Sequence, residues 1–351
     1  MQRQPLEVQT LYAELLEQLA AYEASRAVGH AAGSFVTKTI KGQEYYYFQH
    51  VGPGGTKQQT YLGRRDAALD DLARRFAEGR ANVAAEQESI NRLAALLRAG
   101  GAMITDTPSA RVLRALADVG VFHMGGVLVG THAFVVLGNL LGVRWASSLR
   151  TQDVDIAADR TVDVAVSDTG GDVPSALESL EMGFLPVPGL DRTSPSTSFK
   201  VRGRSLRVDL LTPTARAASR PVAIPRFSAA ARPLRFLDYL IERPVRAAVV
   251  DGTVVAVNVP DPARFALQKL IVAGERPAVM QTKREKDLAQ AAELLELLAE
   301  DRPGDLTLAW EALAGRGQSW VSRVIKSLGG LERVSPGAAT AVRRLVGSEN
   351  D

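Results

Sequence analysis

Residues 151–156 read Thr-Gln-Asp-Val-Asp-Ile and place two aspartates, Asp153 and Asp155, on either side of a single valine. The alternation of charged and apolar residues predicts a β-strand, on which successive side chains point to opposite faces of the sheet. Asp153 and Asp155 are therefore expected on one face, while Val154 and Ile156 point into the core. One strand would serve the hydrophobic core with one face and present two negative charges on the other.

A third carboxylate, Asp209, lies in another strand-like stretch, Leu-Arg-Val-Asp-Leu-Leu at 206–211. A charge in an otherwise apolar strand is costly without a partner, so three such residues favour a functional site over ordinary exposed carboxylates. Carboxylate oxygens suit Mg²⁺, and two such ions about 3.5–4 Å apart can clamp both oxygens of a phosphoryl displacement. We predict that Asp153, Asp155 and Asp209 bind Mg²⁺, with Mn²⁺ as the alternative. Asp209 is also expected to accept the proton of an attacking hydroxyl.

Upstream of these strands, Gly130 and Thr131 join a predicted strand at 123–129 to a predicted helix at 131–141. Glycine lets the backbone approach an anion, and the first amides of a helix are unpaired donors at the positive end of its dipole. This turn is a candidate triphosphate cradle, although no lysine follows it as in a P-loop. The alternative is an ordinary strand-to-helix turn with Thr131 as the N-cap.

The composition limits the class of protein and the kinds of site that the chain can contain. The 351 residues are 46% hydrophobic and 23% charged, with a net charge of +3, which is typical of a globular protein with at most a local basic surface. The absence of cysteine excludes disulfides, thiolate metal sites and a cysteine nucleophile. The most apolar stretch, 125–143, is interrupted by polar residues and indicates a buried strand and helix rather than a membrane span. No signal-like pattern opens the chain, so a cytoplasmic protein is expected.

Periodicity divides the chain into three expected parts. Residues 1–101 form a helix–β-meander–helix module, with helices at 6–26 and 66–99 around a three-stranded meander within 33–62. Residues 102–260 form the core and residues 261–351 a helical C-terminal domain. Within the core we expect a helix at 109–119, a hairpin of 198–201 with 206–211, and a strand pair of 245–250 with 254–259. The fold class is α+β, a mixed sheet flanked by helices.

Several of these motifs resemble a known family. Gly130-Thr131, the Asp153–Asp155 pair and Val208-Asp209-Leu210 look like the nucleotidyltransferase superfamily of polymerase β-like enzymes. The sequence is also similar to a bacterial subfamily, the nucleotidyltransferase type 8 group, which is related to abortive-infection and toxin nucleotidyltransferases. That similarity covers most of residues 30–300 and includes the stretches 129–134, 142–145, 151–155 and 264–270 and the meander at 42–63.

The resemblance implies transfer of a nucleoside monophosphate from an NTP to a hydroxyl, with release of pyrophosphate. Asp153 and Asp155 match the metal-binding pair, Asp209 the third carboxylate, and Thr131 a position usually held by Ser or Thr. The resemblance also points to Lys269 and to Lys286-Asp287 as nucleotide-binding residues. Arg150, just before the aspartate strand, is a further phosphate candidate. His132 stands where a small polar residue is expected, either contacting a base or phosphate or packing as an ordinary helix histidine.

The acceptor is left open by the sequence. An RNA 3′ end such as that of tRNA fits the toxin relatives, with an antitoxin or operon partner, whereas a protein or small-molecule hydroxyl fits the same chemistry. A non-catalytic nucleic-acid-binding module that retains the fold is the rival interpretation. No membrane partner is expected.

The meander interleaves basic residues with Tyr45, Tyr46, Tyr47 and Tyr61. Such a surface can stack bases and follow phosphates. Alternation places Tyr46 on the opposite face from Tyr45 and Tyr47, so at least one face must be core.

Overall fold

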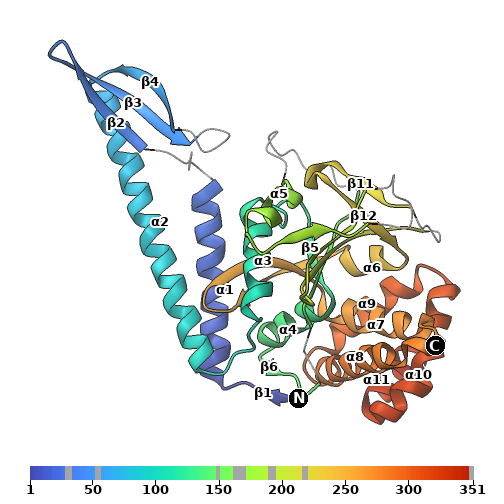
Figure 1. Ribbon diagram of the computed structural model, residues 1–351. Helices are drawn as coiled ribbons and strands as arrows, with labels where there is room; N and C mark the ends of the chain where they lie inside the picture. The colour runs from blue at the N-terminus through green and yellow to red at the C-terminus, as the bar shows by residue number, and fades with distance from the viewer. Residues whose placement is uncertain are drawn as a thin grey trace. The chain divides into compact units, whose positions relative to one another are not determined.

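The computed structural model describes residues 1–27, 34–51, 57–147, 151–160, 171–188, 195–215 and 220–347 (Figure 1). The chain divides into two compact units, one formed by Glu14–Leu93 and the other by Met1–Ala13 together with Ala94–Asp351. Helices α1 (Leu6–Ala27) and α2 (Ala67–Ala99) each contribute to both units. The domain boundaries expected at 101 and 260 remain predictions.

The smaller unit contains the predicted meander. Its strands are β2 (Ser34–Ile40), β3 (Gln43–Val51) and β4 (Lys57–Arg64), paired antiparallel in the order β2-β3-β4. Lys41 and Gly42 join β2 to β3 with φ angles of 52° and 77°, the left-handed pair that a two-residue hairpin turn requires. Phe35 and Phe48 pack edge-to-face on Phe76 of α2, with ring centroids 5.3 and 5.6 Å from it. The inner face of this sheet therefore has an aromatic core.

The larger unit is built on a mixed sheet, as expected from the sequence. The central order is β11-β12-β10-β7-β5; off this path, β9 pairs with β10 and β8 pairs with β9. Strand β10 runs parallel to β7 and β12, while β5 and β9 run antiparallel to their neighbours β7 and β10. The strands are β5 (Val127–Val129), β7 (Asp153–Ala157), β8 (Phe184–Pro186), β9 (Ser198–Val201), β10 (Arg207–Pro213), β11 (Val222–Ile224) and β12 (Ala229–Leu234).

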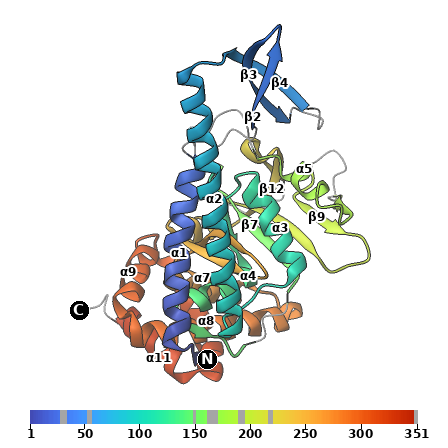
Figure 2. The same ribbon diagram turned by 90° about the vertical axis from the view of Figure 1, so that its left-hand side faces the viewer.

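Helices and a second hairpin surround this sheet. Figures 1 and 2 show α3 against the sheet and α4 running back from β5. The surrounding elements are α3 (Thr107–Asp118), α4 (Gly130–Leu140), α5 (Val173–Glu178), the short 3₁₀ turn η1 (Pro225–Phe227), α6 (Leu237–Ile241), β13 (Pro244–Val250) and β14 (Val254–Pro260). The hairpin of β13 and β14 is confirmed, but the strand predicted from residue 123 is shorter. Gly120 and Gly125 have φ angles of 79° and 82°, so the chain turns before β5 begins.

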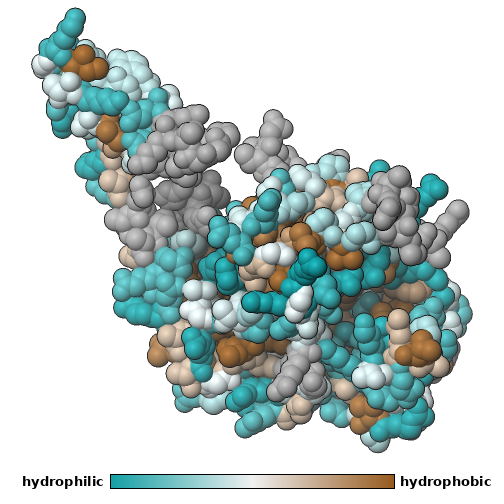
Figure 3. Space-filling view, viewed as in Figure 1, coloured by the Kyte–Doolittle hydropathy of each residue, from teal (hydrophilic) through white to brown (hydrophobic). Residues whose placement is uncertain are grey.

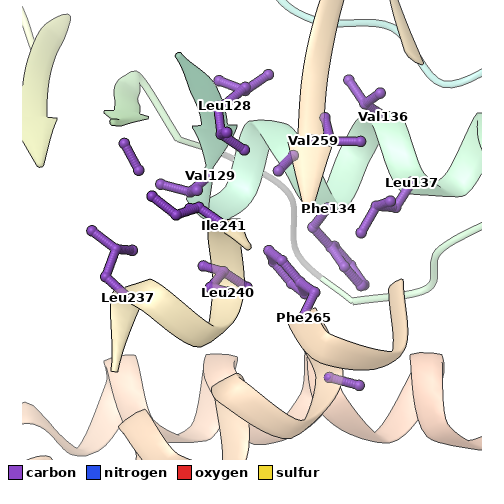
Figure 4. Close-up of a cluster of buried hydrophobic side chains, with 14 of the residues drawn as sticks. Leu128, Val129, Phe134, Val136, Leu137, Leu237, Leu240, Ile241, Val259 and Phe265 are labelled. Atoms are coloured by element: carbon purple, nitrogen blue, oxygen red, sulfur yellow. The ribbon is translucent and has the colours of Figure 1, made fainter. Parts of the chain in front are cut away.

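The core joins α4 to the helices that follow the sheet. The ring of Phe134 lies between Trp145 and Phe265, with centroids 4.6 and 6.3 Å away, and both pairs are nearly parallel at 15°. Figure 4 shows Phe134 and Phe265 facing one another, with Val129 and Val259 nearby. Offset aromatic pairs of this kind stabilise a core beyond their buried area. The start of α4 and the helix that carries Phe265 are thereby fixed relative to each other.

The C-terminal part is helical, as predicted. Its elements are α7 (Pro262–Glu275), the 3₁₀ turn η2 (Ala278–Met280), α8 (Gln281–Asp301), α9 (Pro303–Ala314), α10 (Gln318–Val334) and α11 (Pro336–Gly347). They pack on one another around the fully buried Trp310. Among the residues described, no helix has the length and apolar character needed to cross a bilayer. The face seen in Figure 3 is largely hydrophilic, with hydrophobic residues in small separate groups.

A buried polar network closes the far end of α4. Asn139 accepts a 2.7 Å hydrogen bond from the Met103 amide and donates a 2.8 Å bond to its carbonyl. The Gln4 amide donates to the Asn139 oxygen at 3.0 Å, next to the pairing of β1 (Gln2–Arg3) with β6 (Val143–Arg144). Periodicity did not predict this contribution of the first residues to the core.

Replacing Asn139 with leucine should destabilise the larger unit. The substitution keeps the volume but leaves two backbone groups of Met103 without partners, at a cost of about 2–4 kcal/mol in the free energy of unfolding. The Gln4 amide also loses one of its two acceptors and keeps only the Val143 carbonyl, at 3.2 Å. Thermal unfolding followed by circular dichroism should show a midpoint lower by several degrees. Gln281→Leu, which removes an exposed amide, is the matched control, and equal midpoints for both variants would contradict the prediction.

Candidate active site

The sheet brings the three predicted carboxylates to one face. Asp155 on β7 lies directly opposite Asp209 on the parallel strand β10 and opposite Val129 on β5. Between the aspartates of β7, Val154 is fully buried, and Ile156 is 1% exposed, so the alternation predicted from the sequence is confirmed. Asp153 is exposed and Asp155 is half-buried. The strand thus has the expected apolar and acidic faces.

Asp155 lies where a negative charge is unfavourable. Burial, followed by repulsion from Asp209 and then from Asp153, raises the pKa of its carboxyl from 3.8 to about 7. The nearby positive charges of Lys269 and Arg232 act in the opposite direction, toward a lower pKa. The carboxylates are therefore close enough to repel one another, and a cation bound among them would relieve that repulsion.

Asp209 has one cationic partner in its own strand. Arg207 Nε donates to Asp209 Oδ1 at 2.9 Å and to Ser198 Oγ of β9 at 2.7 Å. Ser198 is paired with Asp209 across the β9–β10 ladder, so all three side chains lie on the acidic face. Arg207 holds Asp209 in place on this face.

Gly130 places the start of α4 against Asp155. Its φ of 70° is left-handed, and a Cβ added there would lie 2.5 Å from Asp155 Oδ2. Only glycine accommodates both the backbone angle and the close carboxylate. The N-cap of α4 is Val129, which makes no side-chain capping bond, and Thr131 is already inside the first turn. The interpretation of Thr131 as the N-cap is therefore wrong, because the N-cap lies two residues earlier, at Val129.

The carboxylates fit a hard divalent cation that shares its shell with a substrate. Among the described residues, no three carboxylate or histidine side chains converge closely enough to enclose an ion by themselves. This is compatible with Mg²⁺, which keeps several waters and is usually held by one or two carboxylates together with substrate phosphates. Asp153 and Asp155 on one strand, with Asp209 opposite, supply such an oxygen-only donor set.

Lys269 of α7 acts electrostatically on Asp155 and is held by an ion pair with a buried carboxylate. Its Nζ donates to Asp287 Oδ1 at 2.8 Å, and Arg276 Nε donates to Asp287 Oδ2 at 2.6 Å. Asp287 is only 3% exposed, so both of its oxygens are engaged by cations inside the protein. The resemblance predicts Asp287 as a nucleotide-binding residue, whereas nothing in the sequence pointed to Arg276.

Two further cations belong to the same electrostatic cluster. The pKa of Lys286 on α8 is lowered, first by burial and then by the charge of Lys269, whereas Asp287, Asp153 and Asp155 counteract this shift. Arg232 of β12 lies opposite Leu211 of β10, on the acidic face of the sheet. Arg232 was not predicted from the sequence, although a charged residue amid the apolar 229–234 was the available signal. Arg150 lies outside the described residues.

His132 is a buried residue of the first turn of α4. It is 3% exposed, and burial is the main cause that lowers its pKa. Its Nε2 has no hydrogen-bond partner within the described part of the chain. This burial supports the interpretation of His132 as a core residue of the helix.

A cavity of about 660 Å³ lies elsewhere. It is lined in part by Leu177 of α5 and by Phe199, which pairs with Val208 on the face of the sheet opposite to Asp209. The cavity therefore does not include the carboxylates.

Gly130→Ala should lower the free energy of unfolding by more than the strain of a left-handed backbone angle alone. Gly203 has a similar φ of 73° but nothing within 4 Å of an added Cβ, so Gly203→Ala isolates the backbone strain of about 1–2 kcal/mol. Gly130→Ala should lose about 1–3 kcal/mol more, because the methyl group displaces the Asp155 carboxylate. Urea denaturation of both variants measures the difference, and equal losses would contradict it.

Asp155→Asn should stabilise the metal-free protein. A carboxyl whose folded pKa of about 7 exceeds its unfolded value of 3.8 lowers stability progressively as the pH rises between those values. In EDTA at about pH 8 the variant should therefore be more stable than wild type by roughly 1–3 kcal/mol. This advantage should shrink toward about pH 4, where both side chains are neutral.

Thermal unfolding across that pH range tests the prediction. Asp118→Asn, at an exposed aspartate near the end of α3, is the control. A stabilisation by Asp155→Asn that does not change with pH would rule out charge burial and repulsion as its cause.

Comparison with known proteins places the chain in a family. A family described as nucleotidyltransferase matches residues 107–315, more than half of the chain. No curated protein matches. Among solved structures, an antigenic nucleotidyltransferase-like protein from Paracoccidioides brasiliensis is similar at 16% identity and a TM-score of 0.33, over 64% of this chain and 94% of that chain. The matched family residues run from α3 to the end of α9 and include all three carboxylates, and the chain belongs to this nucleotidyltransferase family.

Proposed function

We propose that the protein transfers a nucleoside monophosphate from an NTP to a hydroxyl of an RNA acceptor, with Mg²⁺ as the cofactor. The observation that carries this proposal is the apposition of Asp155 and Asp209 on one sheet face, with the uncapped start of α4 beside them. Carboxylates and an open helix N-terminus attract opposite charges. A metal–triphosphate complex carries both charges, so the carboxylates would bind its metal and the helix N-terminus its phosphates.

The carboxylates hold the cofactor in this proposal. Asp153 and Asp155 bind Mg²⁺, with Mn²⁺ able to substitute, and Asp209 completes the donor set. When bound, the ion polarises the α-phosphate and neutralises charge on the reacting oxygens. The raised pKa of Asp155 has burial as its main cause and repulsion from Asp209 and Asp153 as the next, and a bound cation would relieve that repulsion.

The chain supplies the remaining steps from its own residues. The acceptor oxygen attacks the α-phosphorus, the bond from that phosphorus to the bridging oxygen breaks, and pyrophosphate leaves. Asp209, held by Arg207, takes the proton of the attacking hydroxyl. The amides at the start of α4, around Gly130 and Thr131, bind the triphosphate.

Lysines on the helical side neutralise the leaving group. Lys269 and Lys286 interact with the charge of Asp155, so they lie within electrostatic range of the reacting phosphates. Asp287 acts behind them, because its two oxygens fix Lys269 and Arg276. We therefore interpret Asp287 as a positioning residue for Lys269. A role for Arg150 stays a prediction.

The charge beside the carboxylates favours an anionic acceptor. Lys200 of β9 pairs with Arg207, and Arg232 lies opposite Leu211, so both Lys200 and Arg232 belong to the acidic face and are exposed. Cations flanking the carboxylates suit the phosphates of RNA better than a neutral small molecule. The 3′ end of tRNA is the specific acceptor that we propose.

A labelling experiment tests the proposal. The protein is incubated with each α-³²P-labelled NTP, Mg²⁺ and total RNA, and RNA and protein are then separated on one gel. Label should enter RNA with wild type and fall at least about 100-fold with Asp155→Asn, because the metal-binding carboxylate is lost. Lys269→Met should reduce the rate by about 10-fold or more, while Lys283→Met, at an exposed lysine of α8, should not.

Other outcomes identify the alternatives. Label in protein would replace the acceptor but keep the reaction. In a parallel incubation with γ-³²P-labelled NTP, label in the product would indicate phosphoryl rather than nucleotidyl transfer. Equal signals from wild type and Asp155→Asn, or none from either under each NTP, would favour a nucleic-acid-binding module without catalysis. EDTA should abolish incorporation, and Mg²⁺ or Mn²⁺ should restore it.

The biological setting follows from the family resemblance alone. A bacterial toxin or phage-defence role, in the cytoplasm and with an antitoxin or operon partner, therefore stays a prediction.

A further inference from the structure

The outer face of the sheet β2–β3–β4 is the most distinctive surface outside the candidate active site. Three tyrosines meet on it: the ring of Tyr61 lies 6.1 Å from that of Tyr45 and 5.5 Å from that of Tyr47. Strand pairing sets this arrangement, because Tyr47 is opposite Tyr61 and the alternate residue Tyr45 points the same way. Tyr61 is 57% exposed, which is unusual for so large a ring.

The opposite face of the same sheet is already occupied. Tyr46 is 8% exposed and donates a 2.6 Å hydrogen bond to Asp70 of α2, and Phe35 and Phe48 pack on Phe76. The sheet therefore has its hydrophobic core on one side. The tyrosines on the outer side are not needed to complete that core.

Among the side chains that the structure describes on the outer face, every charge is positive. Lys38 pairs with Tyr45 and Arg64 also pairs with Tyr45, and Lys38 Nζ lies 4.7 Å from the centre of the Tyr47 ring. The other described outer-face side chains are neutral, and none is a carboxylate: Ser34, Val36, Ile40, Gln43, Gln49 and Gln59. The acidic residue Glu44 belongs to the inner face and forms an ion pair with Arg65.

We propose that this outer face, defined by Lys38, Tyr45, Tyr47, Tyr61 and Arg64, binds single-stranded RNA. Exposed rings on a sheet can stack unpaired bases of any sequence, and adjacent cations can contact the phosphates between them. Gln59 Nε2 donates to Gln49 Oε1 at 2.9 Å, and the remaining hydrogen-bonding capacity of these two amides can serve base edges. The biological sense of this surface rests on the proposed RNA acceptor, although the binding itself requires no nucleotide transfer.

Fluorescence anisotropy of the full chain with a labelled single-stranded RNA of about 12 nucleotides tests the inference. The titration is done without NTP or Mg²⁺, so the active-site chemistry is silent. Tyr45→Leu and Tyr61→Leu should each raise Kd by about 5-fold to about 150-fold through loss of stacking. Tyr61→Phe should retain wild-type affinity within about twofold, because the ring remains.

Further variants test the contribution of charge to RNA binding and check that the fold is intact. Lys38→Gln should weaken binding and reduce the slope of log K against log salt by about 0.7, the value for one phosphate contact on a single strand. Arg92→Gln, at an exposed arginine of α2 in the same unit, should leave that slope unchanged. Tyr46→Phe, on the inner face, should leave affinity unchanged, and thermal unfolding confirms that each variant is folded.

Several results would overturn the inference. Wild-type affinity in both tyrosine-to-leucine variants would do so, as would equally tight binding of a duplex RNA of the same length, whose stacked bases cannot reach the rings. Failure of the protein to bind the RNA at about 50 mM salt would also overturn it.

The labelling experiment separates this inference from the proposed function. Transfer of label to RNA with no effect of the tyrosines on RNA affinity would leave the function standing and remove this surface. Tyrosine-dependent binding without label in RNA would do the reverse.

Discussion

Repulsion between carboxylates on directly paired strands is the constraint around which the larger unit is organised. Asp155 and Asp209 occupy opposite positions of a parallel ladder, and the β-sheet fixes their backbones so that they cannot separate. Nearby cations offset this repulsion in part: Arg207 donates a hydrogen bond to Asp209, and Lys269 and Arg232 lie within electrostatic range of Asp155. A fold that tolerates this conflict in its central strands is shaped by what it binds, because stability alone would favour apolar residues there.

The position of α4 follows from the same constraint. Gly130 permits the helix to start against the Asp155 carboxylate, and the stacked rings of Phe134 and Phe265 anchor that helix to α7. Lys269 lies four residues after Phe265, one helical turn away, and is held by the buried Asp287. Acidic sheet, open helix end and lysine are therefore three parts of one packed assembly, each held by contacts that do not involve a ligand.

The sequence predicted those parts of the site that local patterns encode. The two-residue period of strand β7 places Asp153 and Asp155 together, and the apolar surroundings of Asp209 identify its strand. Arg232 and Arg276 were missed because their relevance depends on strand register and on a contact eleven residues along the chain. The role of Asp287 could not be read either, since burial of a carboxylate between two cations is a tertiary property. The early turns before β5 follow from glycines whose left-handed angles periodicity does not report.

The first residues of the chain set the order in which this assembly can be completed during synthesis. Gln4 hydrogen bonds to Asn139, and Arg3 forms two 2.7 Å hydrogen bonds with Asp301, 298 residues later. At about 5–20 residues per second, the ribosome takes roughly 15–60 s to deliver that last partner. Gln4 can therefore pair once Asn139 has left the exit tunnel, whereas Arg3 has no access to Asp301 until the end of α8 has been made.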